Sequence, residues 1–318
     1  MIVLTGGGGF IGSNVLAELN AMKMEKIIVV DSLNDAVKWR NLVDKRFVDY
    51  WDKDKFLKEF SGWDEIEAVV HMGARTDTMD FDVQAILEDN YYYSQKLWQQ
   101  CAARGIRFIY ASSASVYGAG ANGFSEASDV RSVIPLNPYA WSKHLFDRWI
   151  TMQEADSLTW AGLRFFNVYG PGEWHKGRMA SVMLHFYNQI METGSCKLFR
   201  SYQPEYPDGG QLRDFVYVKD VASLIAWLVN HDFASGYYNV GTGTPRSFLD
   251  VAEILFARLG MPPKIEFIDM PKGLSSRYQY FTSADMYRTN SLGSGVTFRN
   301  IESGVSDYVN ELRLTQRE

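Results

Sequence analysis

Two residues one helical turn apart, Tyr139 and Lys143, are the strongest candidates for chemistry in this sequence. On a helix, residues i and i+4 share one face, so the phenol and the ammonium group can point into one pocket. A free tyrosine, with a pKa of about 10, is a poor base at neutral pH, but a neighbouring cation stabilises the phenolate and lowers that pKa. The pair therefore predicts a proton-transfer centre in which Lys143 lowers the pKa of Tyr139 and also binds the ribose of a nicotinamide cofactor.

A serine-rich segment upstream of this pair, Ala111 to Gly118, supports the same chemistry. It begins where an expected strand, Ile106 to Ala111, ends, and parallel sheets bind their ligands at the carboxyl ends of their strands. A serine hydroxyl there can hydrogen-bond a substrate alcohol and assist proton transfer to Tyr139. The alternative is a serine-rich turn with no catalytic role. The order of glycine loop, serine segment and tyrosine–lysine pair favours the catalytic interpretation.

A glycine-rich run, Thr5-Gly6-Gly7-Gly8-Gly9-Phe10-Ile11-Gly12, lies between the first expected strand and the first expected helix. Glycines at such a turn let backbone amides approach a pyrophosphate, and the helix N-terminus adds partial positive charge. The run fits a G-x-x-G-x-x-G frame through Gly6, Gly9 and Gly12 and a G-x-G-x-x-G frame through Gly7, Gly9 and Gly12, so spacing leaves the frame open. We expect a dinucleotide site rather than a flexible turn without a ligand.

The residues near the second expected strand leave the choice of dinucleotide open. Asp31 closes this strand, where a carboxylate can bind the adenosine ribose hydroxyls and usually favours NAD. Lys38 and Lys53 lie where cations could neutralise the 2′-phosphate of NADP, although either lysine alone is more often a solvated surface charge.

The elements that must position these residues alternate in type along the first half of the chain. Expected strands cover Ile2–Thr5, Ile27–Asp31, Phe47–Tyr50, Ile66–Met72, Ile106–Ala111 and Ala161–Phe166. Helical patterns lie between them, near Ile11–Ala21, Lys53–Phe60 and Val83–Ala103, and another helix begins near Pro138. This alternation predicts an α/β fold of the Rossmann type, a doubly wound parallel sheet with helices on both faces.

After Tyr169-Gly170-Pro171 the composition changes, and glycine, proline and aromatic residues become more frequent. This change indicates a smaller mixed α/β C-terminal lobe. Short elements return at Phe215–Val218, Asp220–Asn230, Tyr237–Val240 and Ser247–Leu259. We therefore expect a dinucleotide-binding domain over residues 1–168 and a substrate-binding lobe over residues 169–318. Segments at about 213–245 would return to the first domain, so that the two units interleave around a cleft.

Composition excludes several other classes of protein. The chain has 318 residues, 46% of them hydrophobic, with a formal net charge of -6, so we expect no nucleic-acid partner. No apolar run has the length of a membrane span, and the two distant cysteines, Cys101 and Cys196, indicate a reducing compartment. We expect a cytoplasmic protein. The five histidines show no metal-ligand spacing, so no metal site is expected, and His71 is interpreted as a hydrogen-bonded structural residue.

Four segments together resemble the extended short-chain dehydrogenase/reductases, most of which act on nucleotide-diphosphate sugars. They are the glycine run, Ser112 to Gly118, Tyr-Ala-Trp-Ser-Lys at 139–143, and Arg-Asp-Phe-Val-Tyr-Val-Lys-Asp-Val-Ala at 213–222. A narrower match lies at 165–182, with its His-Lys-Gly-x-Met-Ala-Ser-Val run, and at 276–285, with Arg-Tyr-Gln-x-Phe-Thr. Over about residues 1–310 the chain is similar to the family of ADP-L-glycero-D-manno-heptose 6-epimerases.

This resemblance implies an isomerase that inverts C6 of the heptose in ADP-D-glycero-β-D-manno-heptose, a precursor of the lipopolysaccharide core. Hydride would leave C6 for bound NADP, giving a 6-keto intermediate, and return to the other face. Tyr139 and Lys176 would be the two acid/base groups, with Lys143 and Ser113 assisting. A second proton donor is useful because the sugar must turn while the nicotinamide stays in place.

The resemblance also implies the binding residues. Cofactor contacts, including the glycine run, would be made by Gly6, Gly9, Phe10, Ile11, Gly12, Asp31, Ser32, Lys38, Lys53, Met72, Gly73, Ala74, Arg75, Thr76, Asn90, Lys143 and Val168. Substrate contacts would be made by Ser113, Asn167, Arg178, His185, Phe199, Arg200, Ser201, Tyr202, Arg213 and Tyr278. Arg213 suits a diphosphate, because guanidinium offers a planar fork of donors.

The chain departs from the family pattern at Arg75, at Arg178 and in a longer loop over 200–212, all of which bear on sugar specificity. The alternatives are another nucleotide-sugar epimerase or dehydratase, such as a UDP-hexose 4-epimerase, and a non-catalytic module that senses NADP. The resemblance further implies a homo-oligomer, with a pentamer as one form, whose small-molecule partner is the ADP-heptose substrate.

Overall fold

The computed structural model describes residues 1–33, 37–63, 65–153, 158–271 and 278–315. Its centre is a seven-stranded parallel sheet in the order β11-β6-β5-β4-β1-β2-β3. The strands are β1 (Ile2–Thr5), β2 (Ile27–Asp31), β3 (Asp49–Asp52), β4 (Ala68–His71), β5 (Arg107–Ser113), β6 (Trp160–Phe165) and β11 (Gly236–Val240). The order reverses between β1 and β4, which makes the carboxyl ends of these two strands the expected ligand crevice.

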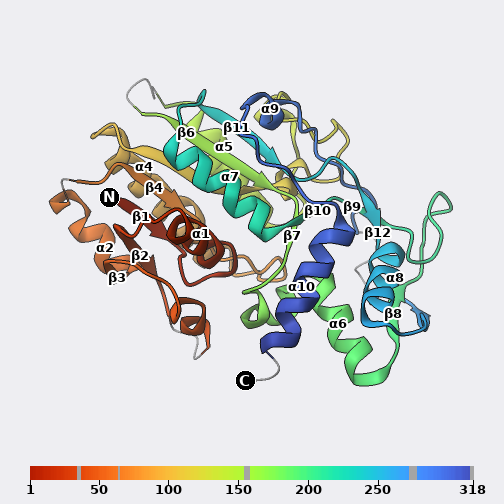
Figure 1. Cartoon of the computed structure of the whole chain (residues 1–318). Coiled ribbons are helices and arrows are strands. Elements are labelled where there is room, and N and C mark those ends of the chain that lie inside the picture. The colour runs from red at the N-terminus through yellow and green to blue at the C-terminus, as the bar shows by residue number, and fades with distance from the viewer. Residues whose placement is uncertain (34–36, 64, 154–157, 272–277, 316–318) are drawn as a thin grey trace.

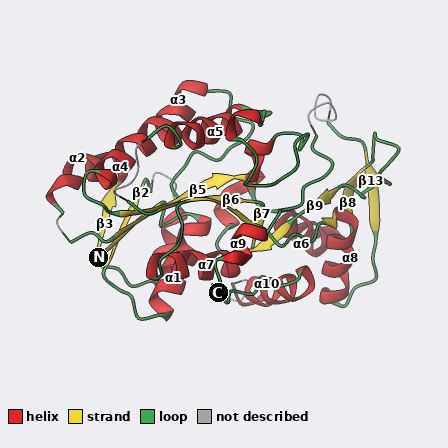
Figure 2. Cartoon of the chain, turned by 90° about the horizontal axis from the view of Figure 1, so that it is seen from above, coloured by secondary structure: helices red, strands yellow, loops and turns green. Residues whose placement is uncertain are grey.

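Helices cover both faces of this sheet (Figures 1 and 2). One face carries α1 (Phe10–Ala21) and α7 (Val218–Asn230), which pack against each other. The other carries α2 (Lys53–Glu59), α3 (Val83–Leu87), α4 (Tyr93–Ala102) and α5 (Pro138–Ile150). The central strands are largely apolar because successive side chains face opposite, covered layers, so that Leu4 joins the α1/α7 core and Val3 the α4/α5 core. The predicted Rossmann fold is confirmed.

A second group of elements lies beside the carboxyl edge of the sheet (Figure 1). Helices α6 (Val182–Thr193), α8 (Phe248–Leu259) and α10 (Ile301–Thr315) enclose a separate apolar cluster around Tyr187, Phe256 and Val309. Small strand pairs accompany them: β7 (Asn167–Tyr169) with β10 (Phe215–Tyr217), β9 (Leu212–Arg213) with β12 (Arg246–Ser247), and β8 (Cys196–Phe199) with β13 (Ile265–Ile268). A short helix, α9 (Tyr287–Ser291), packs near β11.

Several predicted bounds were wrong. The third strand covers Asp49–Asp52 rather than 47–50, since it runs on to Asp52, whose carboxylate caps α2 by accepting from the amides of Asp54 and Lys55. The long helix predicted over 83–103 is divided into α3 and α4 by a π-helical turn, Glu88–Tyr92. Helices α6 and α10 and the pair β8–β13 were not predicted.

The chain enters the second group after β6 and returns to the main sheet at β11. The domain bounds at 168 and 169, and the return at about 213–245, stay predictions. Across the described ranges, the helices are all too short or too polar to cross a membrane.

Candidate functional site

The glycine turn is built so that only glycine fits two of its positions. Gly6 has a φ of +68°, and a Cβ atom there would lie 2.5 Å from the backbone nitrogen of Gly73, at the end of β4. A Cβ atom at Gly12 would lie 2.1 Å from the carbonyl oxygen of Gly6. Because Gly6 and Gly12 pack on each other, the structure favours the frame through Gly6, Gly9 and Gly12.

The N-terminus of α1 is open to an anionic ligand. Its N-cap, Gly9, offers no side-chain hydrogen bond, and the first turn contains no acidic residue. The first amides of a helix need partners from outside it, and they carry partial positive charge. This end of α1 therefore fits a pyrophosphate.

A cavity of about 680 Å³ lies at the carboxyl ends of β1, β2 and β4. Fourteen of the predicted cofactor residues line it: Gly6, Gly9, Phe10, Ile11, Gly12, Asp31, Ser32, Lys38, Lys53, Met72, Gly73, Ala74, Arg75 and Thr76. The Asp31 carboxylate organises one end, accepting from the backbone amides of Gly8 at 2.8 Å and Ser32 at 2.6 Å and from Lys38 Nζ at 2.5 Å.

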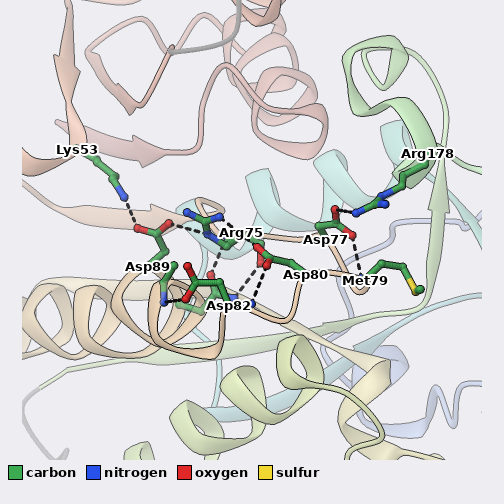
Figure 3. Close-up of polar contacts among 10 residues, drawn as sticks. Lys53, Arg75, Asp77, Met79, Asp80, Asp82, Asp89 and Arg178 are labelled. Carbon is green, nitrogen blue, oxygen red and sulfur yellow. Dashed lines mark hydrogen bonds and ion pairs between the residues drawn. The ribbon is translucent and has the colours of Figure 1, made fainter.

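Ion pairs fill the wall of this cavity on the α2 and α3 side (Figure 3). The Asp89 carboxylate accepts from Lys53 and, at 3.3 Å, from Arg75 Nε, while Arg75 Nη1 lies 3.2 Å from Asp80. Arg75, the departure from the family pattern, is thus neutralised by two carboxylates. Asn90 lies outside the cavity lining and is buried, and its amide holds the backbone of Arg75 at 2.7 and 2.9 Å.

A smaller cavity of about 300 Å³ contains the predicted catalytic residues. Tyr139, Lys143, Ser113 and Lys176 all line it, together with the predicted ligand-binding residues Asn167 and Val168. It shares seven lining residues with the larger cavity: Phe10, Ile11, Met72, Ala74, Thr76, Lys176 and Met179. The two cavities therefore adjoin, as a dinucleotide site and the site of its reaction partner would.

Helix α5 places Tyr139 and Lys143 in this smaller cavity. Asn137 caps the helix by accepting from the amide of Ala140 at 2.8 Å, and Pro138 occupies the first turn, so the bounds follow from the sequence. Lys143 Nζ donates to the carbonyl oxygen of Ala111 at 2.8 Å, and burial lowers the pKa of Lys143 to about 8.

The expected lowering of the Tyr139 pKa by Lys143 is wrong. Burial raises the pKa of Tyr139, and a hydrogen bond with Ser113 lowers it by a smaller amount. The physical reason is that the Tyr139 hydroxyl and the Lys143 ammonium group are both buried, and burial disfavours the charged phenolate. The ammonium group of Lys143 donates its hydrogen bond to the carbonyl oxygen of Ala111. The phenol therefore stays neutral at rest and is available as a proton donor.

Lys176 reaches the junction of the two cavities from the opposite side. It lies on a 3-10 turn, Trp174–Met179, with its Nζ 5.6 Å from the centre of the Phe10 ring. Burial lowers the pKa of Lys176, and the charge of Glu173 raises it by less. An amine with a lowered pKa exchanges protons more readily near neutrality.

The remaining predicted substrate residues are divided between two places. Arg178 lines the larger cavity, not the smaller one, and pairs with Asp77 at 2.5 Å. The others lie beyond both cavities: His185, Phe199, Arg200, Ser201, Tyr202, Arg213 and Tyr278.

Part of this outer group forms an aromatic and cationic cluster. The Arg213 guanidinium lies 5.2 Å from the ring centre of Tyr278, and the Tyr278 and Phe199 rings are 6.4 Å apart. Arg200 and the backbone amide of Ser201 both bind Asp208, at 3.4 and 2.8 Å.

The sequence analysis did not identify several residues that hold the site in place. Glu173 is buried and accepts from the Gly170 amide at 3.2 Å and from the Ser181 amide and hydroxyl, which fixes the ends of the turn that carries Lys176. Glu173 has no regular spacing to Tyr139, Lys143 or the glycine run, so no sequence pattern pointed to it. Asp77 and Met179, which line the larger cavity, were missed for the same reason.

The structural interpretation of His71 is confirmed. Its ring nitrogens lie 2.6 Å from Thr5 Oγ1 and 2.9 Å from Ser94 Oγ, and burial lowers its pKa to about 3. Within the described ranges, no group of three or more histidine, cysteine or acidic residues is arranged to hold a metal ion. Cys101 and Cys196 are both buried free thiols.

Comparison with known proteins agrees with this geometry. The model of the NAD dependent epimerase/dehydratase family matches residues 2–241. The chain is 42% identical to an ADP-L-glycero-D-manno-heptose-6-epimerase of Fusobacterium nucleatum and 45% identical to one of Nitratidesulfovibrio vulgaris, each alignment covering 97% of both proteins.

Solved structures show the same likeness. The crystal structure of the Helicobacter pylori ADP-L-glycero-D-manno-heptose-6-epimerase superposes with a TM-score of 0.83 at 28% identity, covering 98% of this chain and 96% of that one. MoeE5 in complex with UDP-glucose and NAD gives a TM-score of 0.78 at 26% identity over 99% of both chains. The chain is an enzyme that belongs to the NAD dependent epimerase/dehydratase family.

Proposed function

We propose that the protein inverts C6 of ADP-D-glycero-β-D-manno-heptose to give the L-glycero isomer, a precursor of the lipopolysaccharide core. One observation carries this proposal: Tyr139 and Lys176, from different elements, line the same cavity next to a dinucleotide-sized cavity. Two separate acid/base groups suit a reaction that must treat both faces of one carbon. Relatives of this name match nearly the whole chain, including the second lobe.

We propose NADP as the cofactor. The residues fit it, because the α1 N-terminus is uncapped, the glycine turn is open, and two lysines stand near the adenosine end of the cavity. Lys38 and Lys53 would hold the 2′-phosphate, Asp31 and Ser32 the adjoining ribose, and Lys143 the nicotinamide ribose. When bound, the cofactor supplies a hydride acceptor that later returns the hydride.

The chain's own residues supply the proton transfers. Lys176, as the neutral amine, takes the proton of the C6 hydroxyl as this carbon becomes a ketone, while Ser113 hydrogen-bonds the same oxygen. The sugar end then turns, and Tyr139 gives its phenol proton to the oxygen as the ketone is reduced. The hydrogen bond with Ser113 stabilises the phenolate that this step leaves on Tyr139. Lys143, bonded to Ala111, is positioned for the nicotinamide ribose. Proton exchange with solvent then restores both acid/base groups.

Residues of the outer cluster would hold the diphosphate and the adenosine of the substrate. Arg213 is buried, with Tyr278 against its guanidinium, and offers several donors to phosphate oxygens. The further proposed substrate contacts are Asn167, His185, Phe199, Arg200, Ser201 and Tyr202. We also propose a homo-oligomer, with a pentamer as one form, which sedimentation of the purified protein would test.

The direct experiment is to incubate the purified protein with ADP-D-glycero-manno-heptose and to determine the configuration at C6 by NMR. We expect conversion to an equilibrium mixture, with no deuterium from the solvent at C6, because the hydrogen returns as hydride. Turnover of UDP-galactose alone would support a UDP-hexose 4-epimerase instead. Binding of NADP without turnover of either sugar would support a sensing module.

A further inference from the structure

An exposed ion pair joins the segment that carries Lys176 to the loop after β4. Arg178 Nη2 lies 2.5 Å from Asp77 Oδ2 (Figure 3). Next to this pair, the Thr78 hydroxyl lies 3.7 Å from the Met179 sulfur. Asp77 belongs to the loop after β4, and Arg178 to the turn before α6, so both contacts cross from one lobe to the other.

The ends of the turn that carries Lys176 are joined by the hydrogen bonds of Ser181 to Glu173, but the middle of the turn has few contacts. None of the residues Trp174–Met179 is buried, and Gly177 interrupts the turn with φ 51° and ψ −125°. A Cβ atom at Gly177 would meet nothing within 4 Å, so the space beside this residue is open. Between these ends, the contacts of Arg178 and Met179 bind the turn to the loop after β4.

Two hydrogen bonds fix the Asp77 carboxylate, which can therefore hold Arg178 in one position. Its Oδ1 accepts from the backbone amide of Met79 at 2.9 Å, while Oδ2 takes the guanidinium. The hydrogen bond from Arg178 lowers the pKa of Asp77, so the pair is charged throughout the neutral range. Arg178 lines the dinucleotide cavity. It does not line the smaller cavity that contains Tyr139.

We propose that Asp77 and Arg178 are a positioning pair that holds Lys176 at the junction of the two cavities, in place of a direct contact between Arg178 and the sugar. This inference rests on the proposed function, in which Lys176 is one of the two acid/base groups. The pair acts through the geometry of the turn. Since a small displacement of an acid/base group costs a large part of its effect, the pair changes the rate without touching the reacting atoms.

The test compares Asp77→Asn, Arg178→Gln and the double variant with the wild type. Asparagine keeps an oxygen that can accept from the Met79 amide and removes only the charge. We expect kcat for the heptose to fall about tenfold to a hundredfold in each variant, with KM unchanged. The double variant should be no slower than either single one, and exchanging the partners, Asp77→Arg with Arg178→Asp, should restore part of the rate.

Glu25→Gln is the matched control, because it removes the acid of another exposed ion pair, Glu25 and Arg46 at 3.0 Å, far from both cavities. Its kcat should equal that of the wild type. All variants should unfold at the same temperature as the wild type, since exposed ion pairs contribute little to global stability.

Amide hydrogen exchange supplies a readout that needs no sugar. Asp77→Asn should speed exchange in the peptide covering 174–180 and leave the peptide of α5 unchanged. Unchanged exchange and unchanged kcat would overturn the positioning role, as would a raised KM in Arg178→Gln but not in Asp77→Asn. If the wild type does not convert the heptose, the proposed function fails, and the exchange result still decides whether the pair holds the turn.

Discussion

The ammonium group of Lys143 donates a hydrogen bond to the carbonyl oxygen of Ala111 over 2.8 Å. Ala111 lies near the carboxyl end of β5, two positions before Ser113, and Lys143 lies on α5 one turn after Tyr139. This bond therefore ties the helix that carries the tyrosine to the strand that carries the serine. The same contact places a cation inside the protein, where burial lowers its pKa to about 8.

We predict that Lys143→Met abolishes turnover but stabilises the fold at pH 7. The pKa of Lys143 falls from 10.5 to about 8 on folding, so the folded state disfavours the proton, and this penalty is fully present below pH 8. It disappears as the pH rises from 8 to 10.5, where the folded protein has lost the proton first. Removing the charge should raise the free energy of unfolding by about 2 kcal/mol at pH 7, after allowing for the lost hydrogen bond.

Urea unfolding at pH 7 and at pH 10 measures this effect. The difference between the variant and the wild type should shrink at the higher pH. Lys96→Met, at an exposed position of α4, is the control and should show no such dependence. A Lys143→Met protein less stable than the wild type at pH 7 would contradict the prediction.

Tyr139→Phe should lower kcat about a hundredfold to ten-thousandfold, the usual range for loss of a general acid/base, while the affinity for NADP stays the same. The substitution removes the hydroxyl group that transfers the proton. It keeps the ring, which maintains the packing around α5. Steady-state kinetics and fluorescence titration with NADPH measure the two quantities. Tyr287→Phe, at an exposed side chain, should keep full activity. Wild-type turnover in Tyr139→Phe would remove this residue from its role.

The main sheet and the helices around it were predictable because their signals are local. The strands are short apolar runs, the glycine turn follows the first of them, and Asn137-Pro138 marks the start of α5. Elements of the second lobe were missed because their pairing is not local: β8 finds its partner, β13, only at Ile265. Helix α10 is stabilised by a cluster it shares with α6 and α8 rather than by its own sequence pattern.

The candidate site, too, was predictable only where its residues are related by local spacing. The spacing of Tyr139 and Lys143 indicates a shared helix face, and both line one cavity. Lys176 has no such spacing and was found only through the family resemblance, since its position depends on buried Glu173 and the Ser181 hydroxyl. The pair Asp77–Arg178 joins residues far apart in the chain, and no sequence pattern relates them. The Tyr139 pKa was mispredicted because burial cannot be read from spacing.

Lys176→Met should cause a large loss of rate with the fold intact. Methionine keeps the length of the side chain and its contact with Phe10 but cannot exchange a proton. We expect kcat to fall at least about a hundredfold, with the circular dichroism spectrum and the melting temperature unchanged. Lys197→Met, on an exposed part of β8, is the control. Wild-type kinetics would return Lys176 to the role of a surface lysine.

Lys53→Met should weaken NADP binding more than NAD binding. Lys53 lines the dinucleotide cavity and pairs with Asp89, so it offers a charge that a 2′-phosphate can share. Loss of one charge-assisted contact predicts an increase of about tenfold in the Kd for NADP, with little change for NAD. Calorimetric titration with both dinucleotides measures this, and Lys58→Met, exposed on the same helix, is the control. Equal losses for both cofactors would place Lys53 away from the 2′-phosphate.

A buried ion pair beneath α5 holds the catalytic helix in register with β5 and β6. The Asp147 carboxylate accepts from Arg164 Nε and Nη2 at 3.2 Å each, and from the hydroxyls of Tyr110 at 2.8 Å and Ser112 at 3.0 Å. Both charged side chains are 0% exposed, so removing one leaves the other uncompensated in the core. Asp147→Ala should therefore lower the free energy of unfolding by about 3–5 kcal/mol.

Two further variants separate this charge effect from simple loss of contacts. Replacing both partners, Asp147→Leu with Arg164→Met, leaves no buried charge and should recover much of the stability lost in Asp147→Ala. Asp232→Ala removes the fully exposed acid of a pair with Arg107 and should cost less than about 1 kcal/mol. Urea unfolding measures all three. If the double replacement were no more stable than Asp147→Ala, packing rather than charge compensation would hold α5 in place.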